Sequence, residues 1–291
     1  MELATVDDIS GVTLRAKQEG KGLVFTAHDL EPNIEADRMT FEHKTTLLAR
    51  RAGAVMSLTG TAVQRLAQRS QIAVSSVYVV PHGAALPLSL LGDSGTDCTG
   101  FAVFGALRPN RDFRSVVRAW RHLAPRRPPL RLLVRSLREP DRQRYASTLA
   151  TLEDNSCDES DLTVTMTPDV MPPDELVSWC RLASVLVLPY PSVTHSGQLE
   201  LARDLRLRVV APDVPTLRAQ LDAGPECPVV WFRPSDLGDP KRFASHLREA
   251  LSLPASTIDG HSLHEYRVAE HTRLLDAHHD IYSSVTSNMK V

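Results

Sequence analysis

The chain has 291 residues, 42% of them hydrophobic and 23% charged, with a formal net charge of −2. This length exceeds that of a typical single core, so we expect two domains of an ordinary globular protein. A sequence pI near 6.6 argues against nucleic-acid binding, and no apolar run is long enough for a transmembrane helix. The four cysteines form no CxxC pair, which favours a reduced, cytoplasmic chain.

Predicted strands alternate with predicted helices along most of the chain. Short apolar runs predict strands at 23–26, 54–57, 77–80, 101–104, 130–134, 162–166, 185–188, 209–211 and 229–232. Longer periodic stretches predict helices at 40–51, 61–69, 113–123, 142–152, 173–182 and 259–284. This alternation is typical of right-handed βαβ units and predicts an α/β fold with parallel sheets and helices on both faces.

A polar segment at 91–99, rich in turn-forming residues, interrupts the alternation. We interpret it as a linker between a smaller domain at 1–90 and a larger domain at 100–258. The smaller domain has three predicted strands, whereas the larger has enough βα units for a complete doubly wound sheet. The remaining segment, 259–291, is predicted to form a helix that packs back on the first domain.

The C-terminal helix carries His264, His271 and His278 at intervals of seven residues. Ligands of one metal ion must converge, but successive side chains at this interval lie about 10.5 Å apart along a helix. We therefore expect a solvated or packing face there. No other ligand spacing in the sequence indicates a metal site.

The stretch 183–212 predicts a strand, a loop, a helix and a second strand. In a parallel sheet such a loop lies at the carboxyl end of its strand, where open α/β folds bind ligands. Ser196 or Thr194 can cap the helix, and Gly197 allows the backbone to approach an anion closely. The alternative, an ordinary capped loop without a ligand, stays open on this evidence.

Several segments resemble, in their order and spacing, the GT-B glycosyltransferases of family 4, which use nucleotide sugars. The matching segments are VFTAHDLEPN at 24–33, ARRAGAVMSLTGTAVQRL at 49–66, VYVVPHG at 77–83, FAVFGALRPNRDFRSVVRAW at 101–120, PDVMPPDELVSWCRLASVLVLPY at 168–190 and SGQLELARDLRLRVVAP at 196–212. The resemblance implies two Rossmann-like domains that face each other across a cleft. It also implies a nucleotide-diphosphate sugar held mainly by the second domain, with no metal and no other cofactor.

The first domain is shorter than the resemblance leads one to expect. Relatives have a much longer stretch before the strand that here ends at His28, so the resemblance implies an incomplete first domain. Three explanations stay open: a start site placed too far downstream, a natural remnant, or a subunit that a protein partner completes. A peripheral membrane contact also stays open, and no nucleic-acid partner is expected.

The resemblance assigns the donor diphosphate to Arg108, Arg111, Thr194, Ser196 and Gly197. Guanidinium groups and the start of a helix suit this role because both favour negative charge. The alternative for the two arginines is that they are solvated loop residues.

Catalytic roles are implied for His28, which faces the transferred sugar, and for Asp29, which orients its ring. The other site residues that the resemblance implies are Asp169 and Val170 around the nucleotide base, and His82, Gly83, Gly105 and His195 along the wall of the cleft.

The expected function is transfer of a hexose from a nucleotide-diphosphate sugar to a hydroxyl of a glycan, a lipid-linked molecule or a small molecule. Two glutamates that are common in the family are replaced here by Thr194 and Ala202, and Glu200 lies two residues out of register. These departures favour a first alternative, a catalytically inactive binding protein of the same fold that acts with a partner. A second alternative is a sugar-nucleotide epimerase.

Overall fold

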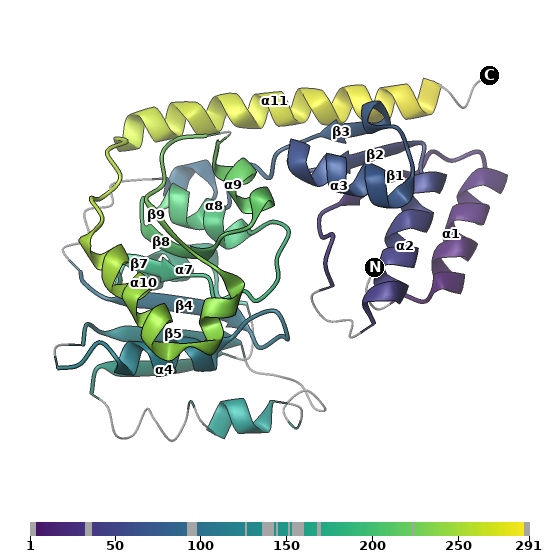
Figure 1. The fold of residues 1–291 in the computed structure, drawn as a ribbon. Helices are drawn as coiled ribbons and strands as arrows, with labels where there is room; N and C mark the ends of the chain where they lie inside the picture. Colours follow the sequence, from purple (N-terminus) through teal and green to yellow (C-terminus); the bar gives the residue numbers. More distant parts are fainter. Residues whose placement is uncertain are drawn as a thin grey trace.

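The computed structural model describes residues 4–32, 37–91, 98–125, 127–135, 143, 145–150, 152, 160–167, 170–222 and 224–287. Within these residues the chain forms two separate parallel sheets with helices packed around them (Figure 1). This arrangement confirms the predicted α/β fold class. The predicted linker at 91–99 lies largely outside the described residues, so the domain boundaries stay a prediction.

The N-terminal sheet has three parallel strands in the order β1-β2-β3. Its strands are β1 (Val24–Ala27), β2 (Ala54–Ser57) and β3 (Val77–Val79). The helices of this half are α1 (Val6–Gln18), α2 (Arg38–Arg51) and α3 (Gly60–Ser70), with 3-10 turns at Val74–Ser76 and Leu88–Leu90.

The C-terminal sheet has six parallel strands in the order β6-β5-β4-β7-β8-β9. Its strands are β4 (Phe101–Ala106), β5 (Leu130–Arg135), β6 (Leu162–Thr167), β7 (Val185–Val187), β8 (Arg208–Pro212) and β9 (Val229–Phe232). The order reverses between β4 and β7, and open α/β sheets bind ligands at such a reversal, outside the carboxyl ends of the strands.

The helices around this sheet are α4 (Phe113–Arg121), α7 (Pro173–Cys180), α8 (Gly197–Asp204), α9 (Pro215–Asp222) and α10 (Pro240–Ser252), with a 3-10 turn at Pro234–Gly238. The helix predicted at 142–152 lies partly outside the described residues. None of the helices in the described part of the chain combines the length and apolar composition needed to cross a bilayer.

The central strands of the larger sheet are buried on both faces. Along β4, Phe101 and Val103 pack into one core, whereas Ala102 between them packs into the other. In β7, Val185 and Leu186 divide in the same way between the two cores. Since side chains of a strand alternate between faces, continuous apolar runs are what a sheet covered on both sides requires.

Helix α11 (Gly260–Ser287) runs along both halves of the molecule (Figure 1). Near its C-terminal end, Ile281 and Val285 pack on Ala54, Met56 and Val80 of the N-terminal half. This contact covers one face of the three-stranded sheet with residues from the far end of the chain.

The other part of α11 is fixed to α8 by buried charges. Arg267, which is 0% exposed, contacts Asp204 at 2.6 Å, Glu200 at 2.8 Å and Glu270 at 2.6 Å. Burial alone would lower the pKa of Arg267, but the carboxylates of Asp204 and Glu200 raise it, so the guanidinium stays charged. Arg203 also contacts Glu200, at 3.1 Å. Glu200 therefore belongs to a structural ion cluster.

Candidate functional site

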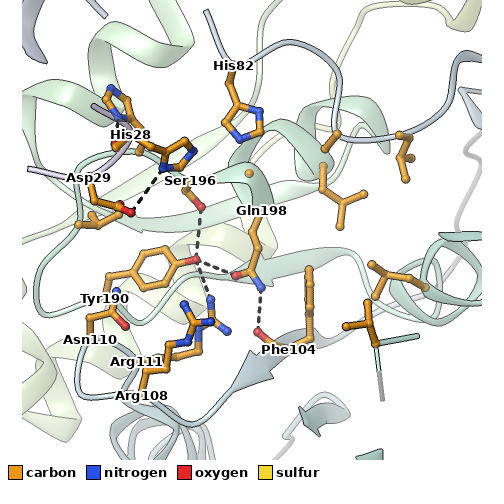
Figure 2. Close-up of a pocket in the computed structure, with 18 of the residues that line it drawn as sticks. His28, Asp29, His82, Phe104, Arg108, Asn110, Arg111, Tyr190, Ser196 and Gln198 are labelled. Atoms are coloured by element: carbon orange, nitrogen blue, oxygen red, sulfur yellow. Dashed lines mark hydrogen bonds and ion pairs between the residues drawn. The ribbon is translucent and has the colours of Figure 1, made fainter. Parts of the chain in front are cut away.

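A cavity of about 600 Å³ lies between the two halves of the molecule (Figure 2). The N-terminal half contributes His28, Asp29 and His82 to its lining. The C-terminal half contributes the residues after β4, the loop after β7 and the start of α8. The cavity therefore lies where the strand order predicts a ligand site, at the reversal between β4 and β7.

Helix α8 begins at Gly197, and Ser196 is its N-cap. The Ser196 hydroxyl accepts a hydrogen bond from the Leu199 N–H at 3.3 Å. The Gln220 side chain fixes the backbone of Ser196 through two hydrogen bonds. Its Oε1 accepts from the Ser196 N–H at 3.1 Å, and its Nε2 donates to the Ser196 carbonyl at 2.9 Å. The start of a helix carries partial positive charge and favours an anion in the cavity.

Arg111 occupies a space that only a glycine at position 105 leaves open. Gly105 has a φ of +126°, and a Cβ placed on it would lie 1.5 Å from Nη1 of Arg111. The guanidinium lies 5.4 Å from the centre of the Tyr190 ring, and its Nη2 donates to the Tyr190 hydroxyl at 3.3 Å. Nε of Arg111 is buried without a hydrogen-bond partner, and no carboxylate among the described residues pairs with the side chain.

Tyr190 connects Arg111 to the start of α8. Its hydroxyl donates to Oε1 of Gln198 at 2.8 Å and lies 3.3 Å from Oγ of Ser196. The Gln198 amide in turn donates to the Phe104 carbonyl at 2.8 Å. The structure thus brings the arginine turn and the helix start to one place, as Figure 2 shows.

Tyr190 and Gln198 are site residues that the sequence analysis missed. Both lie in or beside the loop that it singled out, one directly after a buried strand and the other in the first turn of α8. Their closeness to Gly197 in the sequence was the signal that could have identified them as site residues. The direction of their side chains depends on contacts with Phe104 and Arg111, which are remote in sequence.

His28 and Asp29 lie together on the wall formed by the N-terminal half. Nδ1 of His28 is 3.6 Å from Oδ2 of Asp29, and the histidine side chain is 47% exposed. The neighbouring carboxylate of Asp29 raises the pKa of His28, against the opposing effect of burial. Near neutral pH this pair therefore favours a protonated imidazole in the cavity more than an isolated histidine would.

His195 lines the cavity but is also a link between the halves. Its Nδ1 donates to the His28 carbonyl at 2.8 Å, and its Nε2 lies 3.3 Å from the Thr59 hydroxyl, which caps α3. Burial lowers the pKa of His195 to about 4. The ring is therefore neutral at physiological pH, with the proton on Nδ1.

Thr194 does not line the cavity, although the resemblance placed it at the diphosphate. It is 1% exposed, and its hydroxyl accepts a hydrogen bond from the Leu30 N–H at 2.8 Å. The side chain joins the loop before α8 to the N-terminal half, and its assignment to the diphosphate stays a prediction. Of the two caps proposed from the sequence, the structure has Ser196.

Gly83 also lies outside the cavity lining. It has a φ of +77°, and a Cβ placed on it would lie 2.7 Å from Leu274 of α11. This glycine allows close packing against α11, and its place in the wall of the cleft stays a prediction. Gly105 was also predicted to lie along the wall of the cleft. In the structure it leaves room for the guanidinium group of Arg111.

Arg108, His82 and Val170 also line the cavity, and Val170 has 75% of its surface exposed. Asp169 lies outside the described residues. Among the described residues, no group of histidine, cysteine and carboxylate side chains is arranged to hold a metal ion.

No protein-family model matches the sequence, and no curated protein matches it significantly. Similar solved structures do exist. HepE from Anabaena in complex with UDP superposes with a TM-score of 0.66 at 14% identity, covering 97% of this chain and 77% of that chain. An α,α-trehalose 6-phosphate synthase from Burkholderia multivorans gives 0.67 at 15% identity, covering 97% of this chain and 70% of the synthase.

A glycosyltransferase from Rickettsia africae is similar with a TM-score of 0.62 at 11% identity, covering 97% of this chain and 82% of that chain. The coverage includes both sheets and the C-terminal helix of this chain. The similarity extends to the relative placement of the two halves, which no single Rossmann-like unit would reproduce. This chain therefore has the GT-B fold, as its resemblance to those glycosyltransferases predicted.

Proposed function

We propose that this protein is a glycosyltransferase that moves a hexose from a nucleotide-diphosphate sugar to a hydroxyl acceptor. The observation that carries the proposal is Arg111, a partly buried cation in the inter-sheet cavity with no carboxylate partner among the described residues. An unpaired cation of this kind is unfavourable unless an anion binds beside it. The UDP and UDP-glucose complexes of HepE, which has a similar fold, support a nucleotide-diphosphate as that anion.

In this reaction the bond between the anomeric carbon and the β-phosphate oxygen breaks. A new bond forms to the acceptor oxygen, and the acceptor hydroxyl loses its proton. Negative charge grows on the departing diphosphate, so groups that stabilise this charge lower the barrier. We assign that role to Arg108, Arg111, Ser196 and the N–H groups at Gly197.

The N-terminal half then faces the transferred sugar. We propose that His28 contacts the sugar and that Asp29 orients its ring, since the two side chains lie together on this wall. We also propose that Val170, with Asp169 before it, contacts the nucleotide base.

The test compares nucleotide binding and sugar-donor turnover in the unaltered protein and in Arg111→Met. Calorimetric titration of UDP, GDP and ADP identifies the nucleotide, and incubation with the corresponding sugar donors detects release of the diphosphate. We expect Arg111→Met to weaken diphosphate binding by about 10- to 100-fold, because a charged hydrogen bond is lost. Arg118→Met, at an exposed position of α4, is the matched control and should bind normally. Failure of the unaltered protein to bind any nucleoside diphosphate would refute the proposal.

A nucleotide-binding protein without transferase activity is the second candidate. The observation that favours it is Thr194, which holds the position of a family glutamate but bonds to Leu30 outside the cavity. Tight nucleotide binding with no turnover of any sugar donor would select this candidate.

The location of the protein in the cell, a protein partner and a membrane contact all stay predictions. Cys98, Cys180 and Cys227 are free thiols, which supports a reducing, cytoplasmic location. A protein partner that completes the N-terminal half and a peripheral membrane contact are both compatible with this architecture.

A further inference from the structure

His82 is the one histidine of the cavity for which the preceding sections give no role. It lies after β3 in the N-terminal half, yet its imidazole reaches the start of α8 in the other half. A Cβ placed on Gly197 would lie 3.2 Å from Nε2 and 3.3 Å from Cε1 of His82. One edge of the ring therefore faces the first residue of α8.

The hydrogen bonds of His82 are incomplete. Nδ1 is buried and has no hydrogen-bond partner, and no carboxylate among the described residues forms an ion pair with the ring. Its aromatic neighbour is His28, with ring centroids 5.6 Å apart in an edge-on arrangement. A histidine with a purely structural role normally satisfies its buried nitrogen, as His195 does with both of its own.

The position of His82 complements that of Arg111. Arg111 reaches the start of α8 through Tyr190, entirely from within the C-terminal half. A diphosphate bound at this helix start has oxygen atoms that also face the N-terminal half. His82 is the side chain of that half that lies against Gly197. An imidazole N–H is a suitable donor to a phosphate oxygen whether or not the ring is protonated.

We propose that His82 donates a hydrogen bond to the donor diphosphate, so that the anion is held from both halves of the molecule at once. This inference rests on the proposed function, because it needs a diphosphate at the start of α8. It distinguishes His82 from His28, whose ring is already paired with Asp29.

The experiment compares His82→Ala and His82→Gln with the unaltered protein. The ligand is whichever of UDP, GDP and ADP binds most tightly, and the corresponding uncharged nucleoside is titrated in parallel. We expect His82→Ala to weaken diphosphate binding by about tenfold, since one donor to a charged group is lost, and to leave nucleoside binding unchanged. His82→Gln retains an N–H donor and should recover most of the affinity. His264→Ala, an exposed histidine of α11, is the control.

Two results would overturn the assignment. Unchanged diphosphate binding by His82→Ala would show that the ring makes no contact with the anion. An equal loss for diphosphate and nucleoside would show that the residue shapes the cavity and does not bind phosphate. If His82→Ala fails to fold, His82→Phe supplies the same comparison with His82→Gln, because phenylalanine keeps an aromatic ring but has no N–H donor.

Arg111→Met separates this inference from the proposed function. Loss of binding in Arg111→Met with normal binding in His82→Ala would leave the diphosphate site in place and refute only the role of His82. Absence of diphosphate binding in the unaltered protein would refute both.

Discussion

The two sheets of this molecule are stabilised in different ways. The six-stranded sheet lies between two apolar cores, one on each face, built almost entirely from residues of the same half. The three-stranded sheet has one core of its own, but its second face is covered by Ile281 and Val285 of α11. The comparison shows that the larger half is self-contained, whereas the smaller half depends on a helix from the end of the chain.

The same dependence applies to the site between the sheets. Thr194 and His195, in the loop before α8, bond to Leu30, His28 and Thr59 in the N-terminal half. The loop of the larger half that lines the cavity is thereby joined to the wall formed by the smaller half. Variants that break these links should affect the smaller half first.

The largest expected effect comes from Arg267, which fixes α11 to α8. In Arg267→Met the carboxylates of Asp204 and Glu270 lose their buried cation, and Glu200 keeps only Arg203. We expect a loss of about 3–5 kcal/mol in the free energy of unfolding, measured by urea denaturation. Arg273→Met, at an exposed position of the same helix, should change it by less than about 0.5 kcal/mol. A loss below about 1 kcal/mol in Arg267→Met would contradict the anchoring role.

A smaller loss of stability, expected for Ile281→Ala, should be confined to the three-stranded sheet. Ile281→Ala removes buried apolar contacts with Ala54 and Met56, which we expect to cost about 2–4 kcal/mol. Hydrogen exchange should accelerate in β1–β3 while β4–β9 stay protected. Leu275→Ala, whose side chain is 58% exposed, should leave both sheets unchanged. Equal acceleration in both sheets would mean that the halves unfold as one unit.

The link through His195 predicts a dependence of stability on pH. Its pKa is about 4 in the folded chain and near 6.5 when unfolded, so below pH 6.5 the unfolded state binds more protons. The free energy of unfolding should therefore fall as the pH drops from 6.5 to 4, by on the order of 2–3 kcal/mol from this residue. His195→Asn keeps a donor for the His28 carbonyl but cannot titrate. Its stability curve should be flatter over this range, and parallel curves for the two proteins would exclude the effect.

The glycine beneath Arg111 tests the contribution of the larger half to ligand binding. Gly105→Ala forces the guanidinium away and places an alanine at a φ of +126°. We expect nucleoside diphosphate binding to weaken by about tenfold, or about 1.4 kcal/mol, in a calorimetric titration. Gly60→Ala is the comparison, because a Cβ there meets nothing within 4 Å. Equal affinities for these two variants would show that the position of Arg111 does not matter.

The smallest expected effect concerns the wall of the smaller half. His28 loses its proton as the pH rises above the usual histidine pKa of about 6.5, so binding of a nucleotide sugar should weaken by up to about fivefold. Since Asp29 raises the pKa of His28, Asp29→Asn should move the midpoint of this change to lower pH. A midpoint that Asp29→Asn leaves in place would contradict the assignment of this change to His28.

Much of the fold was predictable from local patterns. Apolar runs such as Phe101–Val103 have the length and composition of buried parallel strands, and the alternation with helices indicates βαβ units. The start of α8 was also predictable, because a serine before a glycine at the end of a loop is a common helix cap. These features depend on neighbouring residues, so the sequence is enough to locate them.

The orientation of the site residues was not predictable in the same way. Thr194 and Ser196 are two residues apart with similar hydroxyls, yet one bonds to Leu30 in the other half and the other caps α8. Glu200 lies in the first turn of α8, yet Arg267 draws it into the ion cluster behind the site. In at least one of these contacts for each case, the residue that fixes the direction of the side chain is remote in sequence.

The sequence by itself determined the class of fold, the positions of the strands and the start of α8, because these follow from periodicity, turn chemistry and helix capping. Only the tertiary structure decided that Arg111, Tyr190 and His82 meet at the start of α8. It also decided that α11 covers the smaller sheet. Such contacts depend on packing and on buried charges joining remote segments, and no local pattern encodes them.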